Sequence, residues 1–274
     1  MFSGLLSIPQ AVLLGIVEGI TEFLPVSSTG HLLVVGELIG FGTGSSSTAA
    51  DTYSIAIQFG AILAVLLLYR IRVWSAMKGL VGADADGRAF LIRLIVAFLP
   101  AAFLGVLAGD AMKSALFGPV PVTIAWVVGG VFLLRWKPTV GSVSLHEMPI
   151  RAALIIGCAQ SIALWPGVSR SLVTLVAALA VGLSMSSAIE FSFLLGLITL
   201  SSATALDLTK HGSELVDQFG ILAPAIGLVC AFITAVIAVK WMVGYLESHS
   251  LRVFGWYRLA IGAVSVVLLA TNVL

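Results

Sequence analysis

Charged side chains are scarce in this sequence, and neither sign of charge is in clear excess. Only 10% of the 274 residues are Asp, Glu, Lys or Arg, while 59% are hydrophobic. Soluble domains contain about 25% charged residues, so a water-soluble fold is excluded. The 14 basic and 13 acidic residues leave a net charge of +1. This balance gives no indication of a nucleic-acid partner, and we expect none.

Cysteine is also scarce. Cys158 and Cys230 stand in apolar runs and lack the spacing of a disulfide framework or of a cysteine-based metal site, so we interpret them as small packing residues. The first ten residues lack the basic segment and the cleavage site of a secretory signal peptide, and we therefore expect none.

Long apolar runs are abundant. A spanning helix needs about 20 mostly apolar residues. Two apolar stretches, 8–40 and 152–182, are interrupted near their middle by Pro and polar residues, so each begins with a half-helix too short to cross. The sequence thus predicts an all-α integral membrane protein with six transmembrane helices and two re-entrant helix-loop-helix hairpins. The six predicted spans are roughly 52–70, 89–109, 119–136, 186–206, 220–243 and 254–273.

The basic residues indicate the sides of the membrane, because Lys and Arg collect in cytoplasmic loops. Eleven of the 14 fall on one side of this layout if each hairpin returns to the side that it entered, the first from outside and the second from the cytoplasm. Aromatic residues beside the same loops, Tyr257 among them, fit an interfacial belt. The eleven are Arg70, Arg72, Lys78, Arg88, Arg93, Arg135, Lys137, Arg151, Lys240, Arg252 and Arg258.

Three spans and one hairpin in each half, entering from opposite faces, form an inverted-topology repeat. We predict pseudo-repeats of about 1–138 and 150–274 within a single polytopic membrane domain, residues 1–274. A few matches at an offset of 142 residues, such as Ser27 with Ser169, support this repeat.

The first interruption lies in a motif, residues 18–31, that carries two carboxylates. Glu18 and Glu22 are four residues apart and share one face of the early half-helix. Ionisable groups inside an apolar segment are costly to bury and are by default functional. Pro25 disfavours helix at the residue before it and ends the half-helix.

Hydroxyl groups and a histidine follow in the same motif. Ser27, Ser28 and Thr29 open the second half-helix, whose unpaired N–H groups favour an anion. His31 lies three residues after Ser28 and four after Ser27, so we expect its imidazole to reach either hydroxyl. Small hydroxyl residues are also common at membrane helix contacts, and a structural role for each of them stays open.

The second motif, residues 165–174, carries a guanidinium group. Pro166 and Gly167 stop the preceding half-helix, Ser169 can cap the next, and Arg170 stands at its start. Arginine binds phosphate oxygens bidentately, and a helix N-terminus adds donors for the same anion. The alternative is that Arg170 is a lipid-headgroup anchor. We expect Ser169, Arg170, Ser171, Thr174 and, from the first motif, Thr29 to bind a phosphate group.

Carboxylates and a phosphate repel each other, so a shared site needs a cation between them. Paired acidic oxygens with phosphate oxygens suit Mg²⁺ or Ca²⁺, and we predict such a divalent cation at Glu18 and Glu22. The residues then make a phosphoryl-transfer site. A transporter of an anionic lipid or solute is the alternative, because broken helices also occur in transporters. The predicted catalytic residues are Glu22, Ser27, Ser28, His31 and Arg170, with metal-activated water as the competing nucleophile.

Other polar residues inside apolar segments are less informative. Gln58, Glu190 and Asp207 lie in or at the end of predicted spans. We interpret them as interhelical hydrogen-bonding groups rather than as members of the site.

At both motifs the chain resembles the undecaprenyl-diphosphatase family, the BacA-type membrane enzymes linked to bacitracin resistance. Residues 18–31 reproduce the family stretch E-G-[IL]-T-E-F-L-P-V-S-S-T-G-H, and residues 165–174 resemble W-P-G-x-S-R-S-x-x-T. The chain departs from the family at Leu172 and Val173, where Gly-Ala is common, and at Thr199, where Pro is frequent. These departures leave the polar residues of both motifs intact.

The resemblance implies that undecaprenyl diphosphate is hydrolysed to undecaprenyl phosphate and phosphate, which recycles the lipid carrier of cell-wall synthesis. It implies a divalent metal, a bacterial cell membrane, and a polyprenyl diphosphate and membrane lipids as partners; a homodimer stays open. Carried over by position, it implies essential roles for Glu18, Glu22, His31 and Arg170 and supporting roles for Ser27, Ser28, Ser169 and Thr174.

Overall fold

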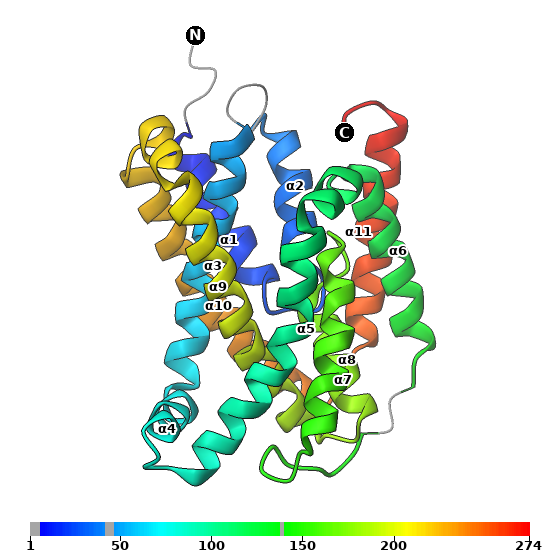
Figure 1. Ribbon diagram of the computed structural model, residues 1–274. Coiled ribbons are helices and arrows are strands. Elements are labelled where there is room, and N and C mark those ends of the chain that lie inside the picture. Colours follow the sequence, from blue (N-terminus) through cyan, green and yellow to red (C-terminus); the bar gives the residue numbers. More distant parts are fainter. Residues whose placement is uncertain (1–5, 42–46, 138–139) are drawn as a thin grey trace.

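The computed structural model describes residues 6–41, 47–137 and 140–274 (Figure 1). All named elements in these ranges are helices, with one isolated parallel bridge between Val143 and Leu183. The all-α class predicted from the sequence is therefore confirmed. The elements are α1 (Ile8–Thr21), α2 (Ser28–Leu38), α3 (Ser47–Leu68), α4 (Arg70–Leu80), α5 (Ala85–Leu116), α6 (Pro119–Arg135), α7 (Ile150–Gln160), the 3₁₀ turn η2 (Ser161–Leu164), α8 (Arg170–Ala180), α9 (Met185–Phe219), α10 (Leu222–Leu246) and α11 (Arg252–Ala270).

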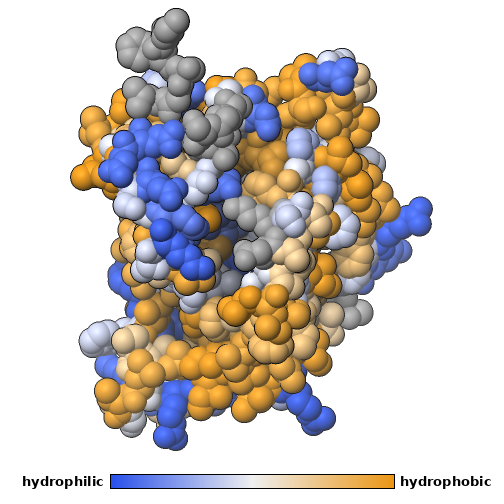
Figure 2. Space-filling model, turned by 45° about the horizontal axis from the view of Figure 1, so that its top comes forward, coloured by the Kyte–Doolittle hydropathy of each residue, from blue (hydrophilic) through white to orange (hydrophobic). Residues whose placement is uncertain are grey.

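Five helices in the described part of the chain are long and apolar enough to cross a membrane, and they coincide with five of the six predicted spans. The sixth prediction, 119–136, coincides with α6, which has only 17 residues. Apolar side chains such as Phe103, Val106 and Ile237 are exposed on the flanks of the molecule, where Figure 2 shows wide hydrophobic areas. The protein is thus a multi-pass membrane protein. The five long segments are Thr48–Leu68, Ala85–Gly109, Met185–Phe219, Leu222–Leu246 and Arg252–Ala270.

Two helical hairpins enter this bundle from opposite ends (Figure 1). The hairpin of α1 and α2 lies in the half of the molecule where α11 ends. The hairpin of α7 and α8 lies in the opposite half, which contains α4. Each is interrupted where the sequence predicted, at residues 22–27 and at residues 165–169. Their non-helical tips therefore meet inside the molecule.

The two returning helices begin in the same unusual way. Ser27 (φ 73°) and Ser169 (φ 70°) both have positive φ, which non-glycine residues rarely adopt. Each side chain caps its helix, accepting a hydrogen bond from the N–H of Gly30 or Leu172. Both α2 and α8 contain 11 residues. Equivalent local geometry at positions 142 residues apart supports the predicted repeat.

Glycine allows the entering half-helices to approach the long helices closely. A Cβ atom on Gly15 of α1 would lie 2.3 Å from the Gly227 carbonyl oxygen of α10, and one on Gly157 of α7 would lie 2.4 Å from that of Ala97 in α5. Small residues that let backbones approach are typical of membrane helix contacts. Neither glycine has room for a side chain.

Arg258 lies inside the protein, in the second turn of α11, rather than in a loop. It was grouped with the cytoplasmic-side residues, but its side chain on α11 is fully buried and donates to backbone carbonyl groups of both hairpin tips. Tyr257, assigned to the interfacial belt, directs its hydroxyl group to His31. Loop charge shows the side of a membrane only for residues at helix ends, and these two lie further along α11.

Candidate active site

The two hairpin tips enclose a polar cavity of about 160 Å³. Both tips contribute to its wall, together with residues of α3 and α9. Two segments that are far apart in the sequence thus contribute polar groups to one cavity. The polar residues that line the cavity are Glu22, Ser27, Ser28, Thr29, Gln58, Gln160, Ser169, Arg170 and Thr199.

The central contact of this site joins the two hairpins. Arg170 Nη2 donates to Glu22 Oε1 at 3.0 Å, and the Ser28 hydroxyl group donates to Glu22 Oε2. The side chains of Arg170 and Glu22 are only 10% and 6% exposed. A buried ion pair is costly unless its remaining polar atoms also find partners, so its place at the junction of two broken helices indicates a functional requirement.

The guanidinium group of Arg170 is held from several sides. Nη1 donates to the Ser192 carbonyl oxygen at 3.2 Å, and the group lies 5.5 Å from the centre of the Phe23 ring. Gly196 gives it space, because a Cβ atom there would lie 2.2 Å from Nη1. Its buried Nε–H has no protein acceptor. Arg170 therefore has a fixed orientation and a donor left for an anion.

The starts of α2 and α8 add backbone donors. The first N–H groups of a helix have no intrahelical acceptor and carry the positive end of the helix dipole. Ser28 and Thr29 of the first turn of α2, and Arg170 of the first turn of α8, line the cavity. Two helix N-termini on one cavity favour a multiply charged anion such as a diphosphate.

Glu18 lies one helical turn before Glu22. Its side chain is fully buried, and no donor in the described part of the chain reaches either carboxyl oxygen. No group of three His, Cys, Asp or Glu residues in the described ranges is arranged to hold a metal ion. Magnesium, however, is usually held by one or two carboxylates together with substrate phosphate oxygens. Glu18 does not line the 160 Å³ cavity, whereas Glu22 does, so a cation held by both carboxylates would meet a phosphorylated substrate on the Glu22 side.

His31 does not make the contact expected of it. Its Nδ1 lies 2.6 Å from the Ser27 carbonyl oxygen, so Nδ1–H is the donor there, and Nε2 lies 2.8 Å from the Tyr257 hydroxyl group. The imidazole also packs edge-on against Trp126, with 5.0 Å between ring centres. Because α11 supplies a hydroxyl partner that sequence spacing could not reveal, the ring faces α6 and α11 instead of the Ser27 and Ser28 hydroxyl groups.

Ser171 and Thr174 were expected to bind phosphate, but their hydroxyl groups have protein partners and do not line the cavity. Ser171 Oγ donates to the Leu24 carbonyl oxygen at 2.9 Å, which ties α8 to the first tip. Thr174 Oγ1 lies 2.8 Å from the Arg170 carbonyl oxygen and 2.6 Å from Ser192 Oγ. Thr29 and Ser169 do line the cavity. Ser171 points to a different face of α8 from Arg170, and Thr174, although on the same face as Arg170, lies one turn farther from the tip.

Three cavity residues were missed by sequence reasoning: Gln58, Gln160 and Thr199. Thr199 Oγ1 lies 3.4 Å from Gln160 Oε1, so these two form a pair. The polarity of Gln58 within an apolar run was the available signal, and we had interpreted it as structural. Glu190 is structural as expected, because it accepts from Arg72 Nε at 2.7 Å.

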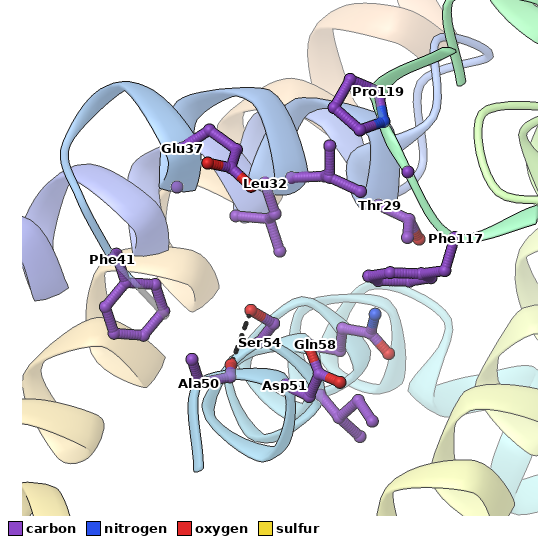
Figure 3. Close-up of a pocket in the computed structure, with 14 residues that line it drawn as sticks. Thr29, Leu32, Glu37, Phe41, Ala50, Asp51, Ser54, Gln58, Phe117 and Pro119 are labelled. Atoms are coloured by element: carbon purple, nitrogen blue, oxygen red, sulfur yellow. Dashed lines mark hydrogen bonds between the residues drawn. The ribbon is translucent and has the colours of Figure 1, made fainter. Parts of the chain in front are cut away.

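A second, larger cavity of about 410 Å³ lies between α2 and α3, next to the first. Thr29 and Gln58 line both cavities. Figure 3 shows these two side chains near Phe117, with Glu37 farther along α2 and Phe41 just beyond its end. Lining residues Glu37 and Asp51 of the larger cavity lie near the end of α2 and the start of α3, and Figure 1 shows these helix ends in the half of the molecule where α1 begins and α11 ends.

Comparison with known proteins finds a family match over nearly the whole chain. The family described as "Bacitracin resistance protein BacA" matches residues 11–264. An undecaprenyl-diphosphatase of Sorangium cellulosum (strain So ce56) is 44% identical over 262 residues, covering 93% of this chain and 84% of that protein. One of Nitrosomonas europaea is 43% identical over 259 residues, and one of Acinetobacter baumannii (strain ATCC 17978) is 40% identical over 258 residues. Each alignment covers 93% of this chain, with 92% and 93% of the two relatives.

Proposed function

The chain belongs to the bacitracin resistance protein BacA family, and we propose from this membership and from its cavity that it hydrolyses undecaprenyl diphosphate to undecaprenyl phosphate and inorganic phosphate. The observation that carries the proposal is the Glu22 carboxylate, which accepts from Arg170 of one hairpin and from Ser28 of the other. An acid that holds both an anion-binding group and a hydroxyl group is suited to phosphoryl transfer. Transport would not require this hydroxyl–carboxylate contact.

Substrate binding depends on the positive groups around the cavity. Arg170, with its partnerless Nε–H, and the N-termini of α2 and α8 would hold the terminal phosphate. When the phosphate takes over part of the Arg170 fork, the contact between Arg170 and Glu22 loosens and the Glu22 carboxylate keeps its hydrogen bond from Ser28. Binding thereby leaves the base in contact with Ser28 for the next step.

The chemical step follows from the Ser28–Glu22 hydrogen bond. Ser28 Oγ gives its proton to the Glu22 carboxylate and bonds to the terminal phosphorus, and the bond from that phosphorus to the bridging oxygen breaks. Undecaprenyl phosphate leaves with the electron pair, and a phosphoserine stays behind. Glu22 passes its proton to the departing phosphate. Water then attacks the phosphorus of the phosphoserine and gives a proton to Glu22, the bond from that phosphorus to Ser28 Oγ breaks, Ser28 Oγ takes the proton from Glu22, and inorganic phosphate is released. Direct attack by a water molecule held by Glu22 is the competing route.

A divalent cation, Mg²⁺ or Ca²⁺, is part of the proposal. Glu18, with two partnerless buried oxygens, and Glu22 would hold it together with phosphate oxygens. Bound there, it supplies neutralisation of the charge that develops on the phosphate oxygens. These two carboxylates would orient it, and the burial of Glu18 without a hydrogen-bond donor among the described residues is costly unless a cation compensates for it.

Removal of divalent cations is expected to abolish phosphate release, and added Mg²⁺ or Ca²⁺ to restore it. Glu18→Gln removes a negative ligand, so the cation concentration for half-maximal activity should rise by about tenfold or more, as for other losses of support at metal sites. Thermal unfolding with methylene diphosphonate and Mg²⁺ gives a readout without turnover: the pair should stabilise the wild type and not Glu18→Gln. Glu247→Gln, an exposed change at the end of α10, is the control. Full activity of the wild type in excess chelator would contradict a metal role.

Ser28→Ala is expected to lower kcat about 10³-fold while leaving the thermal midpoint close to that of wild type, because it removes the nucleophile. Ser27→Ala instead removes the cap of α2, which costs about 1 kcal/mol of stability and leaves most of kcat. Acid quenching during turnover with a labelled terminal phosphate should trap phosphoserine at position 28. A burst of product without any protein-bound label would rule out the serine route and favour water.

We propose that the topology is that of six transmembrane helices, with α6 as the sixth, and two re-entrant hairpins in an inverted repeat of about 1–138 and 150–274. At 17 residues α6 is about 25 Å long, a few ångströms short of the hydrocarbon thickness of about 30 Å. In a bacterial cell membrane with the hairpin of α1 and α2 entering from outside, the larger cavity would admit the headgroup from the outer face. A homodimer stays a prediction.

A further inference from the structure

The carbonyl groups of the first hairpin tip, residues 22–27, are held by side chains from three other elements. Ser171 of α8 donates to the Leu24 carbonyl oxygen at 2.9 Å, and Trp126 Nε1 of α6 donates to that of Val26, also at 2.9 Å. Arg258 Nη1 of α11 lies 3.4 Å from the carbonyl oxygen of Pro25, the residue between Leu24 and Val26. A break in a membrane helix exposes carbonyl groups that must find donors within the protein. Three successive ones do so here.

Two of these donors also reach the second tip, residues 165–169: Ser171 Oγ lies 3.0 Å from Ser169 Oγ, and Arg258 donates to a backbone carbonyl group there. Arg258 Nη2 donates to the Gly167 carbonyl oxygen at 2.9 Å and to the Ala125 carbonyl oxygen of α6 at 2.8 Å. The side chain is fully buried, and among the described residues the groups that accept from it are backbone oxygens. Burying a guanidinium group without an anion is costly, so its hydrogen bonds to backbone carbonyl oxygens, including those at both tips, must compensate for the lost hydration.

A glycine gives this guanidinium group the space that it occupies. A Cβ atom on Gly129 of α6 would lie 2.5 Å from Arg258 Nη2. The preceding residue on α11, Tyr257, bonds Nε2 of His31 at 2.8 Å, so two neighbouring residues of α11 hold the first motif. Neither Arg258 nor Tyr257 lines the 160 Å³ cavity. Both instead contact residues of the two motifs that contribute to the cavity wall.

From these contacts we infer that Arg258 is a positioning residue for the hydrolysis proposed above: its guanidinium fork fixes the two hairpin tips against each other, and thereby the placement of Ser28 and Glu22 relative to Arg170. The inference rests on the proposed function. Displacing reacting groups by about 1 Å can cost about 10²-fold in rate. The alternative role, a positive charge that attracts the diphosphate from a distance, would need only the charge and not the fork.

Three variants separate geometry from charge. Arg258→Lys keeps the charge but cannot span two tips, Arg258→Met removes both, and Gly129→Ala displaces the intact guanidinium group. We expect each to lower kcat about 10²-fold with KM within about threefold of wild type, and to speed amide hydrogen exchange in both tip peptides, around 22–31 and 165–172. Arg252→Lys, an exposed change in the first turn of α11, is the matched control and should change neither.

Trp126→Phe tests whether the two tips can be loosened separately, because it removes a donor to the first tip only. Amide hydrogen exchange should rise around 22–31 and stay unchanged around 165–172. If Arg258→Lys keeps the wild-type kcat while Arg258→Met loses it, charge is what matters and the positioning role is overturned. If both variants fail to fold, Gly129→Ala decides, and a wild-type rate and wild-type exchange there would overturn the inference. An inactive wild type would instead refute the proposed function, while the exchange measurement would still test the contact between the tips.

Discussion

Replacing Glu22 by glutamine is expected to lower kcat for undecaprenyl diphosphate by about 10³-fold or more, the range for loss of a positioned base. Glutamine has nearly the same shape, but its amide nitrogen is a donor. It cannot accept the Ser28 hydroxyl group and the Arg170 guanidinium group at once, as both carboxylate oxygens of Glu22 do. The proton acceptor for Ser28 is lost, and Arg170 loses its anionic partner.

The measurement for Glu22→Gln is phosphate release under saturating substrate, with thermal unfolding in the same detergent. We expect the thermal midpoint to fall by no more than a few degrees, because glutamine fills the same space and removes one buried charge. Glu247→Gln is the control, since Glu247 is exposed at the end of α10. A Glu22→Gln enzyme that folds and keeps more than a tenth of the wild-type kcat would contradict the role given to this carboxylate.

Arg170→Lys is expected to lower kcat/KM by at least about 10²-fold, the cost of one lost donor to a developing charge, with a larger loss for Arg170→Ala. Lysine keeps the charge, but its single ammonium group cannot donate to Glu22 and the Ser192 carbonyl oxygen in the fixed directions of the fork. Part of the loss should appear in KM, because Arg170 would hold the phosphate before the reaction as well as during it.

The control for Arg170 is Arg151→Lys, an exposed position in the first turn of α7 of the same hairpin. Steady-state kinetics for both lysine variants give kcat and KM separately. Should Arg170→Lys match wild type in kcat/KM, a lipid-headgroup anchor would explain this arginine better than a phosphate-binding group.

The order of the helices and the position of both breaks could be predicted from the sequence. Apolar runs of spanning length and the Pro residues inside two of them leave few other arrangements in a membrane. The meeting of Glu22 and Arg170 followed from the same argument, because hairpins that enter from opposite faces bring their tips together. The structure places these residues 3.0 Å apart, Nη2 to Oε1.

The contacts of His31 and Arg258 could not be predicted, because each depends on which face of α11 turns inward. Spacing along the first motif suggested that His31 would reach Ser27 or Ser28, yet Tyr257 lies 226 residues further along the chain and takes Nε2. Arg258 looked like a loop residue because it stands six positions after Arg252, near other basic residues. Its partners are backbone oxygens, which no side-chain pattern can reveal.

The most direct test of the whole account is the release of inorganic phosphate from undecaprenyl diphosphate by the purified protein in detergent. Wild type, Glu22→Gln and Arg170→Ala are compared, each with Mg²⁺ and with excess chelator. We predict stoichiometric undecaprenyl phosphate and inorganic phosphate from the wild type with Mg²⁺ alone. Equal release by all three proteins would contradict the site, and no release by any of them together with uptake of the lipid into liposomes would show a transporter instead.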